Sequence, residues 1–127
     1  WSRRHREWFR VLGTLYEIVW ATTWEHRANV AISPLLGLGT LPVIEFNRGR
    51  AGDTWKLANV SEFAGDRAAA WVDDELFGDA RSWAAHRDAP TLLVRTMSAV
   101  GLTEIHVAEL EGFARAVIDN DDDGLML

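Results

Sequence analysis

Short apolar runs alternate with amphipathic, helix-like segments along this chain of 127 residues. The residue pattern predicts strands over residues 16–22, 41–46, 68–73 and 91–95. It predicts helices over residues 1–12, 24–36 (interrupted or restarted at Ser33-Pro34), 55–64, 79–87 and 103–118. Strands that alternate with helices favour a mainly parallel sheet covered on both faces. The length suits one domain, residues 1–127, without internal repeats or an interdomain linker.

Several of the predicted helix ends rest on single residues. Gly13 is expected to stop the first helix, Gly65 closes the helix over 55–64, and Pro90 follows the helix over 79–87. Thr103 is placed to cap the last helix. Its expected apolar face consists of Ile105, Leu110, Phe113 and Val117.

Composition excludes several kinds of function. The net charge of -6 argues against broad binding to a nucleic-acid backbone. The absence of cysteine excludes disulfides, zinc–thiolate sites and cysteine nucleophiles, and it agrees with a cytoplasmic location. No apolar stretch is long enough to span a bilayer and no signal peptide is visible, so no membrane partner is expected. Residues 119–127 are expected to form an acidic, flexible tail.

The predicted strand over residues 68–73 ends in two adjacent carboxylates, Asp73 and Asp74. Acids in this position often hold a cation such as Mg²⁺, because unpaired charges at a strand end are costly. Lys56, the only lysine of the chain, lies upstream at the start of a predicted helix. Other interpretations remain open: either aspartate can cap the following segment, and Lys56 can be a solvated helix residue.

Three polar positions are expected to meet at one edge of the sheet. Thr22 ends a predicted strand, Lys56 opens a helix, and Asp73 and Asp74 end another strand. In a parallel sheet the carboxyl ends of the strands and the starts of the following helices share one edge, where open α/β sheets bind ligands. A hydroxyl, an ammonium and two carboxylates with Mg²⁺ suit a phosphorylated ligand.

These residues resemble the sequence motifs of the haloacid dehalogenase-like (HAD) superfamily. The strand Ile18–Thr22 resembles its second motif, Lys56 its third, and Trp71-Val72-Asp73-Asp74 its acidic fourth motif. The amino-acid sequence from about Trp8 to Ala114 resembles most closely the HAD domains associated with Swiss-army-knife RNA repair proteins.

The resemblance implies a Rossmann-like three-layer sandwich and a magnesium-dependent phosphohydrolase. It implies that Thr22 binds the transferring phosphoryl group, that Lys56 stabilises its charge, and that Asp73, assisted by Asp74, holds Mg²⁺. A phosphorylated small molecule, a nucleotide or a nucleic-acid end is the expected ligand. Thr23, Trp24 and Trp55 stand beside the motifs and are expected to contact substrate, although tryptophans here also suit core packing.

The chain departs from the family pattern in one respect. The family nucleophile belongs to an Asp-x-Asp motif on a first, central strand, and no aspartate precedes Asp53. We therefore expect a domain that lacks the first strand, either an N-terminally truncated piece or a degenerate relative, and that is inactive by itself. The alternatives are a non-catalytic binding or interaction module and a different phosphate-binding Rossmann-like domain.

Overall fold

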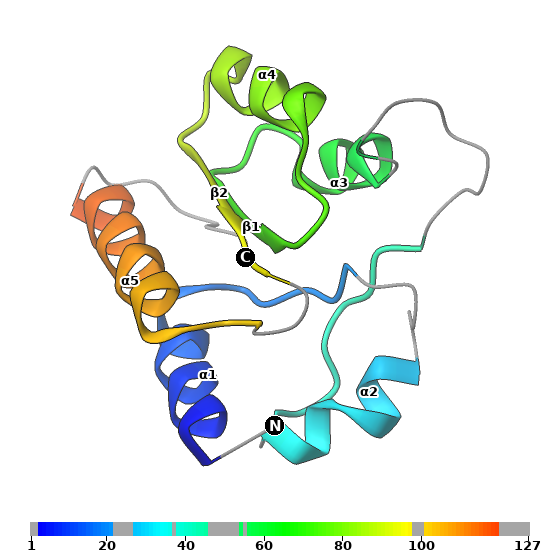
Figure 1. Cartoon of the computed structure of the whole chain (residues 1–127), viewed down its shortest axis with the longest axis vertical. Coiled ribbons are helices and arrows are strands. Elements are labelled where there is room, and N and C mark those ends of the chain that lie inside the picture. The colour runs from blue at the N-terminus through cyan, green and yellow to red at the C-terminus, as the bar shows by residue number, and fades with distance from the viewer. Residues whose placement is uncertain are drawn as a thin grey trace.

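The computed structural model describes residues 3–21, 27–36, 38–45, 54, 56–97 and 101–119. Within these ranges the chain forms a mixed α/β structure with a parallel two-stranded sheet (Figure 1). The helical elements are α1 (Arg3–Leu15), α2 (Arg27–Ala31), the 3₁₀ helix η1 (Ser33–Leu36), α3 (Leu57–Ala64), α4 (Gly78–His86) and α5 (Glu104–Asp119). The strands are β1 (Ala69–Asp73) and β2 (Thr91–Arg95).

The two strands pair in parallel, with Ala69 opposite Thr91 and Asp73 opposite Arg95. Parallel neighbours cannot be joined by a tight turn, and α4 provides the connection between them. Four of the five residues of β1 are buried, which fits a strand covered on both faces. The predicted strand–helix–strand unit over residues 68–95 is therefore confirmed.

Alternate residues of β1 enter two different hydrophobic clusters. Ala70 packs with side chains of α1 and α5, among them Leu12 and Leu110. Trp71 packs on the opposite side with Val60 of α3 and Ala80 of α4. Because side chains alternate across a strand, helices cover both faces of β1, and Asp73 falls on the same face as Trp71. Figure 1 shows α1 and α5 side by side on one side of the strands and α3 and α4 on the other.

The helix α3 ends where the sequence predicts, immediately before Gly65. Gly65 lies immediately after the helix, has a φ of 58°, and donates its backbone N–H to the carbonyl of Ser61 at 3.0 Å. A residue with a side chain adopts this positive φ only with strain, so glycine is favoured here.

The structure corrects two predictions about helices. Gly13 does not stop the first helix, which continues to Leu15, because Leu12 and Tyr16 are both buried in the core and packing outweighs the modest cost of a glycine. The prediction that Ile105 belongs to the apolar face of α5 is wrong, since Ile105 is 73% exposed. The buried residues of α5 are Val107, Leu110, Ala114 and Val117.

The strands predicted over residues 16–22 and 41–46 are only partly present in the described ranges. They meet at one parallel bridge, between Trp20 and Val43. The N–H of Trp20 donates to the carbonyl of Pro42, and the N–H of Ile44 donates to the carbonyl of Trp20, each at 2.9 Å. Pro42 has no N–H of its own and cannot donate the next hydrogen bond on its side of the bridge, so the ladder does not extend in that direction. On the other side, residues 22 and 46 lie outside the described ranges.

The last helix runs one residue further than predicted and includes Asp119, so the expected flexible tail does not begin there. Residues 120–127 lie outside the described ranges. Among the described helices, none combines the length and the apolar composition needed to cross a bilayer.

Candidate functional site

The end of β1 and the start of α3 bring Lys56 and Asp73 together. Lys56 is the residue before α3, and Asp73 is the last residue of β1. The Lys56 ammonium nitrogen Nζ donates to Asp73 Oδ2 at 2.8 Å, and the two side chains are 13% and 5% exposed. The predicted proximity of these two residues is confirmed.

A third segment reaches the same point. Lys56 Nζ also donates to the backbone carbonyl of Ala21, at 3.1 Å. Ala21 follows Trp20, whose own N–H and carbonyl bond to the segment at Val43. Because successive carbonyls of an extended chain point to opposite sides, the carbonyl of Ala21 is free of that pairing and faces Lys56. The ammonium thus joins three segments that are distant in sequence.

Asp73 is held in its ionised form. Burial by itself raises the pKa of this carboxyl, but the hydrogen bond and the positive charge of Lys56 outweigh it, so the pKa lies below the ordinary value. Asp73 Oδ1 in addition accepts the backbone N–H of Glu75 at 3.1 Å. The predicted capping of the following segment is therefore found at Asp73, together with its contact to Lys56.

Asp74 occupies a more exposed position than Asp73. The hydrogen bond between the two carboxyl groups raises the pKa of Asp74 above its ordinary value, with burial and the nearby charges acting in the same direction. The adjacent acids therefore differ in character, because Asp73 is charged and paired with Lys56 whereas Asp74 is the one that more readily holds a proton.

The two aspartates fit Mg²⁺ by their chemistry. This ion takes oxygen ligands, keeps several waters, and is commonly bound by one or two carboxylates together with phosphate oxygens. A carboxylate has about four lone-pair positions, and the hydrogen bonds of Asp73 with Lys56, the Glu75 N–H and the Asp74 carboxyl group occupy all but about one of them. In the part of the chain that the structure describes, no three His, Cys, Asp or Glu side chains form a metal-binding group.

The other predicted site residues, Thr22, Thr23, Trp24 and Trp55, lie outside the described residues. Their nearest described neighbours do lie at the site, since Ala21 precedes Thr22 and Lys56 follows Trp55. The expectation that these side chains line one ligand site stays a prediction.

Two residues beside the site, Thr54 and Arg95, are not among those that the sequence motifs predict. Thr54 is 2% exposed, and its hydroxyl donates to Asp79 Oδ1 at 2.6 Å. The sequence pattern predicts only that Asp79 begins a helix, and no spacing rule connects it to Thr54. Arg95 is the partner of Asp73 in the sheet register, and its guanidinium lies 5.5 Å from the ring centre of Phe77. A cation at the end of the neighbouring strand is a signal that could have been noted.

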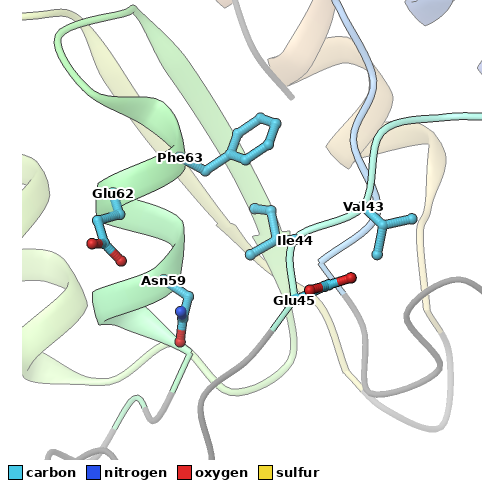
Figure 2. A pocket seen from close by; sticks show the side chains of 6 residues that line it. All are labelled: Val43, Ile44, Glu45, Asn59, Glu62 and Phe63. Carbon is cyan, nitrogen blue, oxygen red and sulfur yellow. The ribbon is translucent and has the colours of Figure 1, made fainter.

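A pocket of about 350 Å³ opens between α3 and the segment Val43–Glu45. Figure 2 shows Phe63, from α3, and Ile44, from the facing segment, extending into the space between these two elements. Asn59, Glu45 and Glu62 supply its polar lining. Two carboxylates repel an anion, so this pocket is unsuited to a phosphate, and neither Lys56 nor Asp73 lines it.

No protein-family model, no curated protein and no solved structure matches this chain. The resemblance to the HAD superfamily therefore rests on the motif residues alone.

Proposed function

We propose that the edge formed by Lys56, Asp73 and Asp74 binds a phosphoryl group together with Mg²⁺, as part of a HAD-like, Rossmann-like phosphohydrolase domain. The observation that carries the proposal is the contact of 2.8 Å between Lys56 Nζ and Asp73 Oδ2 at the carboxyl end of β1. Open α/β sheets bind ligands at this edge. A largely buried ammonium beside a strand-end acidic pair suits an anion and a cation bound together.

The residues have distinct proposed roles. Lys56 neutralises charge on the phosphoryl oxygens, and Asp73 holds it in place through their ion pair. Asp73 and Asp74 would hold the metal, and Thr22 would donate its hydroxyl to a phosphoryl oxygen. Bound Mg²⁺ supplies additional neutralisation of phosphoryl charge. Thr23, Trp24 and Trp55 would contact the remainder of a phosphorylated small molecule or nucleic-acid end.

Hydrolysis through an aspartyl phosphate needs a nucleophile, and no aspartate precedes Asp53 in these 127 residues. We therefore expect binding without appreciable turnover from this chain alone. Binding is also the sharper test, because it does not depend on the nucleophile.

The experiment is a calorimetric titration of the chain with inorganic phosphate, with and without MgCl₂. We expect phosphate binding that requires Mg²⁺ and that is lost in Asp73→Asn and Lys56→Met. Asp88→Asn is the matched control, since Asp88 is an exposed acid in the loop after α4 and should bind like the wild type. Wild-type binding that is indifferent to Mg²⁺, or that survives in Asp73→Asn, would contradict the proposal.

One observation favours a second candidate, a non-catalytic interaction module. Both oxygens of Asp73 already have protein partners, Lys56 Nζ and the N–H of Glu75, as a purely structural ion pair would. In that case the titration shows neither phosphate nor Mg²⁺ binding, while loss of either partner still destabilises the fold.

A further inference from the structure

A partly buried contact lies two residues from Lys56, between Thr54, which precedes α3, and the first turn of α4. Both the backbone N–H and the hydroxyl of Thr54 donate to the Asp79 carboxylate, the N–H at 3.0 Å to Oδ2 and the hydroxyl at 2.6 Å to Oδ1. The Thr54 hydroxyl oxygen in turn accepts the N–H of Phe77 at 2.9 Å. These hydrogen bonds join Thr54, which precedes α3, to the start of α4.

Thr54 also begins the turn that carries Lys56. The carbonyl of Thr54 accepts the N–H of Leu57 at 3.0 Å, which closes the turn around Lys56 before α3 begins. The Lys56 side chain then reaches Asp73, at the other end of the loop that leads to α4. The segment before α3 therefore contacts both ends of the loop between β1 and α4. Lys56 bonds to Asp73 at the start of this loop, and Thr54 bonds to Asp79 just after its end.

We propose that Thr54 and Asp79 are positioning residues that fix the Lys56 ammonium against Asp73 for phosphate binding. The proposal deepens the proposed function and rests on it for the ligand, whereas the positioning itself is a property of the chain. An ammonium on a flexible four-carbon side chain needs a fixed backbone to hold one geometry. The buried hydroxyl and the carboxylate supply that fixed point.

A simpler role for Asp79 is to cap α4, because its Oδ1 also accepts the N–H of Ala80 at 2.9 Å. The two roles can be separated. Thr54→Val removes the hydroxyl and leaves the contact between Asp79 and Ala80 in place. Thr54→Ser retains the hydroxyl and is the matched control. Asp79→Asn, on the other element, keeps an oxygen for Ala80 and removes the charge.

The experiment observes Lys56 directly. It is the only lysine of the chain, so ¹⁵N-lysine labelling yields a single side-chain ammonium signal in NMR spectra. A held ammonium exchanges slowly with water and gives a sharp signal. We expect Thr54→Val and Asp79→Asn to broaden or abolish this signal while circular dichroism remains native, and we expect Thr54→Ser to preserve it. Phosphate affinity in MgCl₂ should fall roughly threefold to tenfold in the first two variants, the effect of about one hydrogen bond.

An unchanged Lys56 signal in a folded Thr54→Val or Asp79→Asn variant would overturn the proposal. The unaltered chain provides a second measurement if both variants fail to fold. On warming, the Thr54 amide and the Lys56 ammonium should lose protection from exchange together, and loss at different temperatures would contradict the coupling. If the wild type binds no phosphate, the proposed function fails, while the NMR comparison still decides the positioning role.

Discussion

Lys56 and Asp73 lie seventeen residues apart in sequence, yet their side chains form an ion pair with 2.8 Å between Nζ and Oδ2. Both side chains are largely buried, and the ammonium also bonds to the carbonyl of Ala21. The pair therefore connects the start of α3, the end of β1 and the segment after α1. Under the proposed function, the same contact is expected to affect both stability and ligand binding.

Lys56→Met should destabilise the fold strongly. The substitution leaves the Asp73 carboxylate buried without its main counter-charge, and removal of one partner of a buried pair costs about 3–5 kcal/mol. The double variant Lys56→Met/Asp73→Leu should lose clearly less than the sum of the two single variants. Urea unfolding of the four proteins at pH 7 measures this. Additive losses would show that the pair contributes no coupling energy.

The stability that Asp73 provides should disappear in acid. Its pKa is lower in the folded chain than in the unfolded chain, where it is about 3.9. The unfolded chain thus binds the proton more readily, and the contribution is fully present above about pH 4 and is lost as the pH falls through the folded value. The difference in unfolding free energy between wild type and Asp73→Asn should shrink between pH 6 and pH 3. A difference that stays constant over this range would contradict the assigned pairing.

Arg87→Lys should destabilise the contact between the α3–β1 loop and the end of α4. The guanidinium of Arg87 donates to the carbonyls of Gly65 and Arg67 and to the Thr91 hydroxyl, and it lies over the Trp83 ring. A lysine ammonium cannot cover this set of acceptors with the same geometry. We expect a loss of about 1–3 kcal/mol, the cost of leaving one or two acceptors without a partner. Arg81→Lys, at an exposed position of α4, is the control and should be near neutral.

The proximity of Lys56 and Asp73 could be predicted because it depends on the order and direction of strands and helices rather than on side-chain packing. The predicted strand over residues 91–95 has the bounds observed for β2, and the strand over 68–73 differs from β1 by one residue. Once these strands are parallel, the end of β1 and the start of a neighbouring helix must share an edge.

Two features were not predicted correctly: the exposure of Ile105 and the contact between Thr54 and Asp79. Ile105 precedes Leu110 by five residues, which places it about 140° around the helix from that buried position. Spacing from Val107 would have identified the buried face. The pairing of Thr54 with Asp79 joins a residue of one loop to the first turn of a distant helix. No periodicity encodes such a contact, because it depends on the path of both loops.

Tyr16→Phe should weaken the packing of α1 against α5. The Tyr16 hydroxyl donates to the backbone carbonyl of Leu110 at 2.8 Å in the core, and its removal leaves that carbonyl without this donor, at a cost of about 1–2 kcal/mol.

Burial also raises the pKa of Tyr16 above its ordinary value of 10.0. Because the folded value exceeds the unfolded one, this contribution is present below about pH 10 and is lost as the pH rises further. Tyr16 is the only tyrosine, so absorbance at the tyrosinate band should report its ionisation only together with unfolding. Ionisation near pH 10 in a chain that remains folded by circular dichroism would rule out the buried hydrogen bond.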